Sequence, residues 1–187
     1  MRFAKLALAF SVAGAVMVAP MGAHAQGGTQ GKAPAQAKAA TLDDAAIVGI
    51  FDAANGWDIA TGKLAKTKAT RADVKEFGGM ISDAHTAVRQ QGRDLAKKLG
   101  VTPTPVPKDF ALLVDYNATM KKLNGLSGAA FDKAFLEHEV AYHQAVIDAV
   151  TKQFLPAIKN AELKKFVESV APAFQAHLEG AQNLLKK

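Results

Sequence analysis

The chain has 187 residues, a formal net charge of +6 at pH 7 and no cysteine. The lack of cysteine excludes disulfides, thiol catalysis, thiolate metal ligands and iron–sulfur clusters. The lysines are scattered along the chain and form no clustered basic face, so we expect no nucleic-acid partner.

The first 25 residues have the three parts of a secretory signal peptide. Arg2 and Lys5 give a basic start, an apolar run follows, and Ala23-His24-Ala25 forms an A-x-A cleavage site. The apolar run is shorter than the roughly 20 residues that span a bilayer, which disfavours the alternative of a retained membrane anchor. We therefore expect cleavage near Ala25, a periplasmic or secreted protein, and no membrane span in the mature chain.

Residues 26–41 are small, polar and without periodicity, so they are expected to form a disordered leader to a single domain over residues 42–187. The first helix is predicted over residues 43–67, capped by Thr41 or Asp43. Its apolar residues recur at helical spacing, and Asp58 falls on their face. A slight rotation that brings Trp57 inward and moves Asp58 to the edge is the alternative.

The second helix is predicted to begin at Thr70, which forms a T-x-x-D capping box with Asp73, and to stop at Gly100. His85 lies on its apolar face. Three prolines then exclude a helix over residues 101–107, and a short helix is predicted from 109 to 123. This long connection is sufficient to cross the end of a helical bundle.

The third helix is predicted from Ser127, its cap, to Phe154, with Pro156 just beyond its end. Glu139 and His143 lie one turn apart on its apolar side. A histidine at such a position is desolvated and requires a partner.

The fourth helix is predicted from Asn160 to Leu185, with His177 on its apolar face and a kink at Pro172. Residues 161–166 (AELKKF) echo residues 72–77 (ADVKEF) at the start of the second helix. This similarity supports pairing of the first two helices with the last two.

The chain resembles the exported bacterial domain of unknown function 4142 family, which belongs among the ferritin-like helical bundles. The resemblance covers roughly residues 42–185, and the family usually has glutamate in place of Asp58 and aspartate in place of Ala84. It is carried by Phe77, Asp83-Ala84-His85-Thr86, Leu123-Asn124-Gly125-Leu126-Ser127-Gly128, Phe131-Asp132, His143 and His177-Leu178. The resemblance implies a ferritin-like bundle of the periplasm or envelope with no assigned activity. Together with the helical periodicity and the long connection, this predicts an all-α fold, a ferritin-like four-helix bundle with a long crossover between helices two and three.

Four helices thus each carry a polar residue on an apolar face. The candidate metal ligands are Asp58, His85, Glu139, His143 and His177. Ferritin-like di-iron bundles use two Glu-x-x-His pairs, and this chain contains none. The set of three imidazoles and two carboxylates suits iron, manganese, copper or zinc.

Helical rise predicts a level difference of roughly 7 Å between Asp58 and His85. The five residues therefore form either one site or a staggered column. A lone histidine on an apolar face is also commonly a hydrogen-bonded core residue, which is the structural alternative to a ligand.

Two functions are consistent with the sequence, which contains no nucleophile elbow and no phosphate-binding loop and leaves any enzymatic activity open. The first is an exported bundle that binds a transition metal for storage, buffering or redox protection. The alternative is a non-catalytic envelope-stress or interaction module with structural histidines. A homo-oligomer or an envelope protein is a further candidate partner.

Overall fold

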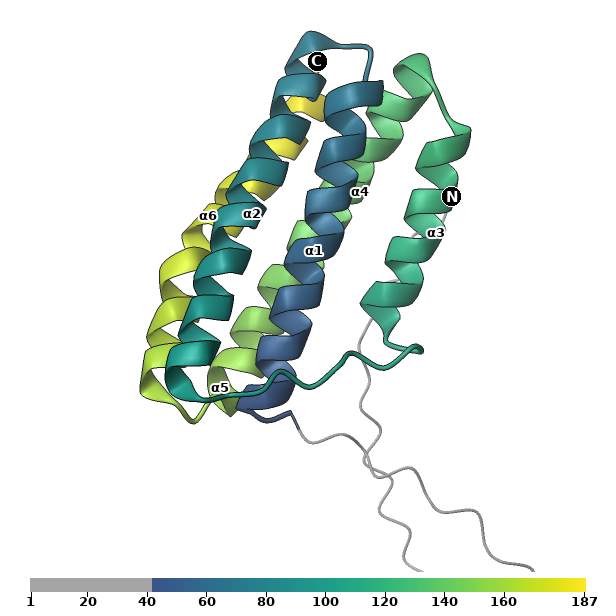
Figure 1. The fold of residues 1–187 in the computed structure, drawn as a ribbon. Coiled ribbons are helices and arrows are strands. Elements are labelled where there is room, and N and C mark those ends of the chain that lie inside the picture. The colour runs from purple at the N-terminus through teal and green to yellow at the C-terminus, as the bar shows by residue number, and fades with distance from the viewer. Residues whose placement is uncertain (1–41) are drawn as a thin grey trace, which may run out of the picture. The chain divides into compact units, whose positions relative to one another are not determined.

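The computed structural model describes residues 42–187, so the predicted signal peptide and leader lie outside the described residues. The described part contains helices and no strand, which confirms the all-α prediction (Figure 1). Its elements are α1 (Asp44–Lys68), α2 (Ala72–Leu99), α3 (Ala111–Gly125), α4 (Gly128–Ala149), the π-helical turn η1 (Val150–Phe154), α5 (Leu155–Ala157) and α6 (Ala161–Leu185). None of the helices in this range is long and apolar enough to cross a membrane.

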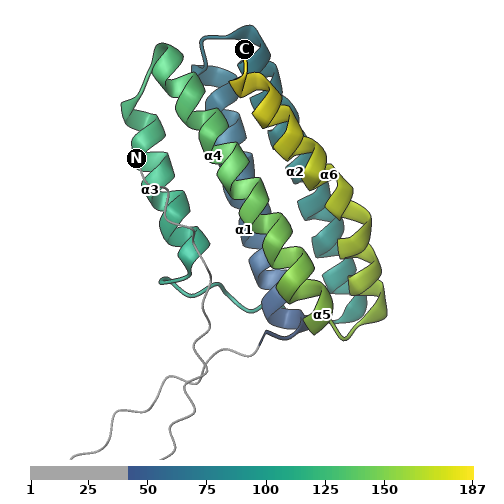
Figure 2. The ribbon, with the colours of Figure 1, turned by 180° about the vertical axis from the view of Figure 1, so that it is seen from behind.

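Four long helices lie side by side, each antiparallel to its neighbours (Figures 1 and 2). Helix α1 pairs with α2 and α4 pairs with α6, and the two hairpins meet along α2–α6 and α1–α4. The connection from α2 to α4 crosses one end of these helices and returns to the other end through α3. The long crossover is therefore present, and α2 and α4 run in the same direction.

The crossover lies directly against the first turns of α1. The amide of Thr104 donates to the carbonyl of Ala45 (3.0 Å). A Cβ atom on Gly49 would lie 1.9 Å from the Thr104 carbonyl oxygen, so this approach requires glycine. On the same side, Trp57 stacks on Tyr116 of α3 with ring centroids 5.8 Å apart. Trp57 thus faces α3, and Asp58 turns inward with 1% of its surface exposed, which rules out the rotated alternative.

The start of α2 differs from the prediction. Its N-cap residue is Arg71, and its side chain makes no capping hydrogen bond. The predicted Thr70–Asp73 capping box is wrong because the carboxylate of Asp132, on α4, accepts from the amides of Thr70 (2.8 Å) and Arg71 (2.9 Å). Asp73 instead pairs with the Arg71 guanidinium.

The start of α6 is held in a similar way by the other hairpin. Asp44, in the first turn of α1, accepts from the amides of Lys159 (2.8 Å) and Asn160 (2.9 Å). The Asn160 side chain also accepts from the amides of Glu162 and Leu163, which makes it the N-cap of α6. Each hairpin therefore supplies a carboxylate that holds the start of the second helix of the other hairpin.

Two prolines lie inside helical structure. The third long helix was expected to end at Phe154, but it continues through η1 into α5, which includes Pro156. The wider π turn accommodates a residue that lacks an amide hydrogen. Helix α6 is continuous through Pro172.

Apolar clusters fill both ends of the helical domain. One is centred on residues near the α1–α2 turn and the start of α4, including Phe77, Ile81, Phe131 and Phe135. The other is formed near the start of α1 and the end of α2, and includes Ile47, Val150, Leu163 and Val167. The polar residues of the candidate site lie between these clusters, in a segment of the core that they shield from water.

Candidate metal centre

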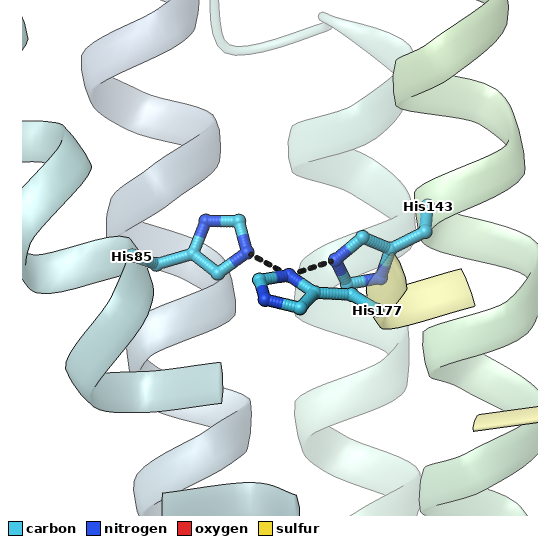
Figure 3. Close-up of side chains that lie close together, drawn as sticks. All are labelled: His85, His143 and His177. Atoms are coloured by element: carbon cyan, nitrogen blue, oxygen red, sulfur yellow. Dashed lines mark hydrogen bonds between the residues drawn. The ribbon is translucent and has the colours of Figure 1, made fainter. Parts of the chain in front are cut away.

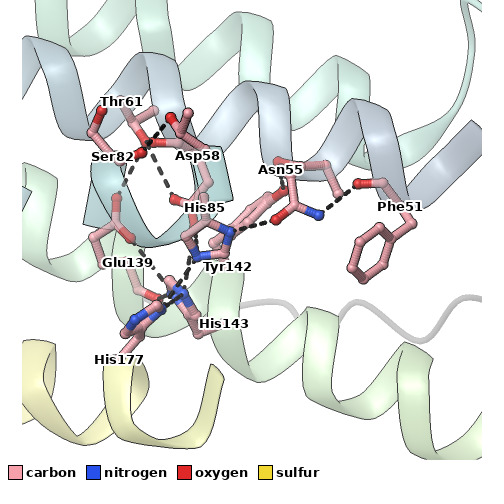
Figure 4. A network of polar contacts seen from close by, with 12 residues as sticks. Phe51, Asn55, Asp58, Thr61, Ser82, His85, Glu139, Tyr142, His143 and His177 are labelled. Atoms are coloured by element: carbon pink, nitrogen blue, oxygen red, sulfur yellow. Dashed lines mark hydrogen bonds and ion pairs between the residues drawn. The ribbon is translucent and has the colours of Figure 1, made fainter. Parts of the chain in front are cut away.

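The predicted site residues converge in one buried cluster between the four long helices (Figures 3 and 4). Each is at most 6% exposed. They are Asp58 on α1, His85 on α2, Glu139 and His143 on α4, and His177 on α6. They form a compact cluster, and the staggered column is wrong.

The direction of the side chains explains why the levels match. Asp58 lies ten residues before Lys68, the last residue of α1, and His85 lies thirteen residues after Ala72, the first residue of α2. Counted from the helix ends, the difference is about 4.5 Å along the axis. Side chains lean toward the N-terminus of their own helix, so on antiparallel helices these two lean toward each other. The level difference predicted from the sequence did not take this side-chain direction into account.

Four donor atoms on four different residues face one another at the centre of the cluster. The Oδ2 atom of Asp58 lies 2.8 Å from Nε2 of His85 and 3.4 Å from Nε2 of His143. The Nδ1 atom of His177 lies 3.2 Å from Nε2 of His85 and 3.3 Å from Nε2 of His143 (Figure 3). The four atoms are thus linked in a ring of contacts of 2.8–3.4 Å, in which Asp58 and His177 each lie next to both His85 and His143.

The tautomer of His85 follows from its neighbour Asn55. The Asn55 amide nitrogen donates to the carbonyl of Phe51 (2.7 Å), so the amide oxygen must face His85. That oxygen lies 2.8 Å from Nδ1 of His85, which therefore carries the proton and donates (Figure 4). In the neutral ring, Nε2 then presents a lone pair to the centre of the cluster.

The tautomer of His143 follows from the backbone. Its Nδ1 atom lies 3.0 Å from the carbonyl oxygen of Glu139, an acceptor only, so Nδ1 donates and Nε2 presents a lone pair. Among the described residues, Oδ2 of Asp58 has no hydrogen-bond partner of suitable geometry. Two nitrogen lone pairs and a carboxylate oxygen thus point at one another in a buried core, which is unfavourable unless a cation or a shared proton lies between them.

Glu139 adjoins this set from the other side of His143. Its Oε2 atom lies 3.4 Å from Nδ1 of His143, the ring nitrogen that faces away from the four-atom set. The hydroxyl of Thr61 lies 3.3 Å from Oε1 of Glu139 and 3.4 Å from Oδ1 of Asp58, and so bridges the two carboxyl groups. Glu139 is therefore a neighbour of the four converging atoms.

The protonation states favour metal binding. Burial, together with the nearby Asp58 charge, raises the pKa of Glu139 well above its ordinary value. Burial opposes ionisation of Asp58, but its interactions with the neighbouring histidines, those with His85 foremost, outweigh it and hold its pKa below the ordinary value. Burial lowers the pKa of His143, and burial with the neighbouring imidazoles lowers that of His177 to about 4. At neutral pH the cluster thus offers an ionised Asp58 and neutral imidazoles at His143 and His177, the forms that bind metal.

A small cavity of about 20 Å³ adjoins the cluster, and its lining includes His85 and His143. This volume holds about one water molecule. Its polar lining also includes Tyr142, whose hydroxyl donates to the carbonyl of Ala54 (2.8 Å). The ring of Phe174 stacks on His85 with centroids 5.6 Å apart and closes the cluster on that side.

Two residues of the polar network were missed as site residues. Asn55 lies three residues before Asp58 and Thr61 three residues after it, so both share its face of α1. That spacing is the signal that could have identified them. Their hydrogen bonds depend on side-chain orientation, which helical periodicity does not give.

A protein-family model described as "Domain of unknown function (DUF4142)" matches residues 29–184, so the chain belongs to this family. The search of curated proteins and the search of solved structures each found no match. The family description gives no activity, and the function has to be inferred from the site itself.

Proposed function

We propose that this protein binds one transition-metal ion in the core of a ferritin-like helical bundle. The proposed ligands are Asp58, His85, His143 and His177, whose facing atoms lie 2.8–3.4 Å apart, with Glu139, which groups with Asp58 and His143, beside the ion. The observation that carries the proposal is the convergence of the Asp58 oxygen with two imidazole nitrogens whose protons are fixed on the opposite side of each ring. Metal-binding histidines typically donate their second nitrogen to a protein acceptor in this way.

The donor set limits the identity of the ion. Three nitrogens and one carboxylate oxygen suit the borderline divalent ions zinc, iron, manganese and copper. Calcium and magnesium prefer sites made of oxygen ligands alone, so three imidazole nitrogens disfavour them.

The role that best fits this site is metal buffering or redox protection. The cluster supplies ligands for a single ion, whereas bulk storage requires space for many. We further propose that the protein acts in the periplasm or envelope after cleavage before Gln26. Sequencing the N-terminus of the protein recovered from the periplasmic fraction tests this part, and a mature protein that begins at Met1 would contradict it.

The metal content of the purified protein tests the central proposal. We expect close to one equivalent of metal per chain by elemental analysis of untagged native protein, and loss of that metal in His143→Gln. The matched control is His138→Gln, because His138 is a half-buried histidine on the same helix that lies outside the cluster. A native protein that contains no metal and takes up none after dialysis against zinc or iron(II) would refute the proposal.

The 2.8 Å separation of His85 and Asp58 favours a second candidate, a structural role. This separation is also that of a charge-assisted hydrogen bond, which would form if Nε2 were protonated. The protein would then be a non-catalytic module of the envelope in which a buried ion pair fixes the register of the helices. In that case the protein contains no metal, and His85→Gln lowers the free energy of unfolding equally in the presence and absence of metal ions.

A further inference from the structure

A second cavity, of about 170 Å³, lies between α1, α2 and α6 beside the crossover. Most of its lining is apolar. The apolar side chains are Ile47, Val48, Phe51, Pro103, Leu163, Phe166 and Val167. An engineered apolar cavity of about 150 Å³ in another protein stays dry and binds benzene, so the present cavity has room for one aromatic ring or a short branched chain.

Gly92 contributes to this space from α2. A Cβ atom there would lie 3.2 Å from Phe51 Cε1 and 3.5 Å from Phe166 Cε1, the rings that form the inner wall. The absence of a side chain lets these rings pack edge to face, with centroids 5.5 Å apart. Phe51 also separates the cavity from the histidine cluster, because its other neighbour, Phe174, stacks on His85.

The polar part of the lining is a cluster of three charged residues, Asp52 of α1 with Arg89 and Arg93 of α2. The Asp52 carboxylate accepts from Nε (3.0 Å) and Nη2 (2.9 Å) of Arg89 and also from Nε and Nη2 of Arg93. Burial opposes ionisation of Asp52, but the two guanidinium groups outweigh it and lower its pKa. Two cations therefore share one anion.

The two guanidinium groups of this three-residue cluster have N–H donors that make no hydrogen bond. Among the described residues, the Nη1 atom of neither arginine has a hydrogen-bond partner, and 51% of the Arg93 side chain is exposed. The net charge of one positive unit and these free guanidinium donors fit a carboxylate, which arginine binds in a planar, paired geometry. A neutral or cationic polar group would find no complementary charge there.

From the apolar lining and this charge we propose that the cavity is a binding site for a small organic carboxylate, with an aromatic or short branched apolar part in the cavity and the carboxylate on Arg93 and Arg89. The site is separate from the metal cluster, and the inference stands whether or not the protein binds metal.

Isothermal titration calorimetry of the full-length protein with benzoate, benzyl alcohol and acetate tests the proposal. Benzoate supplies both the ring and the charge, benzyl alcohol only the ring, and acetate only the charge. We expect benzoate to bind about tenfold more tightly than benzyl alcohol, and acetate not to bind measurably. Benzoate that does not bind, or that binds no better than acetate, would overturn the proposal.

Substitutions test whether the carboxylate binds at the arginines of this cavity. Arg93→Gln is expected to weaken the binding of benzoate about tenfold and to leave the affinity for benzyl alcohol unchanged. The matched control is Lys98→Gln, which removes another exposed, paired cation from α2 and is expected to change neither affinity. Equal weakening by both variants would show general charge attraction and refute the site.

Val48→Phe is designed to fill the cavity and to abolish binding of both aromatic probes. Because this variant can fail to fold, nuclear Overhauser contacts in the unmodified protein provide an independent check. The ring protons of benzoate should contact the methyl groups of Ile47 and Val167. Contacts to methyl groups elsewhere, with none to these two residues, would overturn the assignment.

Discussion

The side-chain oxygen of Asn55 lies 2.8 Å from Nδ1 of His85 and orients an imidazole on the neighbouring helix. The amide is itself fixed, because its nitrogen donates to the carbonyl of Phe51. This pair of contacts decides which nitrogen of His85 faces Asp58. Asn55 is therefore a positioning residue that touches none of the four converging atoms.

Replacing Asn55 with alanine should weaken metal binding while leaving all proposed ligands in place. Loss of such an outer partner typically reduces metal affinity by roughly 10- to 100-fold, because the ring is no longer held in one tautomer and orientation. Competition with a chelator of known affinity measures the change. Asn124→Ala is the control, since Asn124 donates to a carbonyl four residues earlier in the same way but is exposed, on α3. Unchanged affinity in Asn55→Ala would mean that His85 is not a ligand.

The two carboxyl groups of the cluster should respond differently to isosteric amides. Asp58 is ionised, and its Oδ2 atom faces two imidazoles, so Asp58→Asn removes the charge that an ion would meet. Burial and the Asp58 charge raise the pKa of Glu139 and so favour its neutral form, which Glu139→Gln resembles, so this variant changes little. At a zinc concentration of about 100 times the dissociation constant, bound metal adds about 2.7 kcal/mol to the free energy of unfolding. We expect Glu139→Gln to keep most of that gain and Asp58→Asn to lose it, by denaturant unfolding with and without zinc. The reverse order would assign the ligand role to Glu139.

The metal-free protein should become less stable as the pH falls from about 6.5 to about 4. The pKa of His177 is lowered to about 4 in the folded protein, whereas an unfolded histidine titrates near 6.5. Between these values the unfolded state binds more protons, so the free energy of unfolding rises with pH across this window. One such group contributes at most about 1.4 kcal/mol per pH unit. Urea unfolding at several pH values should give a shallower dependence for His177→Gln. An equal slope in both proteins would show that His177 does not titrate in this range.

Asp132 should contribute measurably to stability because it holds the start of α2 from α4. Its carboxylate is buried and accepts from two backbone amides. Asp132→Ala leaves both donors without a partner, so we expect a loss of about 1–3 kcal/mol in the free energy of unfolding. Asp83→Ala, at an exposed position within α2, is the control and should change stability by less than about 0.5 kcal/mol. Equal small effects would show that water replaces the carboxylate at little cost.

Gly49 should be intolerant of a side chain because the crossover lies on it. A Cβ atom would overlap the Thr104 carbonyl oxygen, so Gly49→Ala must displace this segment and lose the hydrogen bond to Ala45. We expect a loss of about 1–3 kcal/mol, measured by thermal or denaturant unfolding. Gly125→Ala provides the contrast, since nothing lies within 4 Å of a Cβ atom there and alanine favours the helix. A stable Gly49→Ala protein would mean that the crossover moves freely.

The sequence predicted the helices and their buried faces well because both follow from periodicity. The stop at Gly100 is an example, since this residue adopts the left-handed conformation (φ 67°) that glycine tolerates. The Asp132 contact with the start of α2 could not be predicted in this way, because it joins residues about sixty positions apart. The Thr70–Asp73 pattern instead suggested a local solution that the chain does not use.

The candidate site was predicted as a set of residues but not as an arrangement. Helical phase brought Asp58, His85 and His177 inward, which burial confirms. Their positions along the bundle axis depend on where the turn between α1 and α2 begins and on the direction of each side chain. A count of residues across the turn therefore overestimated the axial distance between Asp58 and His85. The proton positions on His85 and His143 required the hydrogen-bond partners, which only the structure gives.

Each hairpin carries half of the four converging donor atoms, two on α1 and α2 and two on α4 and α6. A bound ion would therefore act as a removable cross-link between distant parts of a chain that has no cysteine, and would stabilise the folded state because the unfolded chain does not assemble the ligands. The rate at which the hairpins separate would then depend on the metal supply of the compartment.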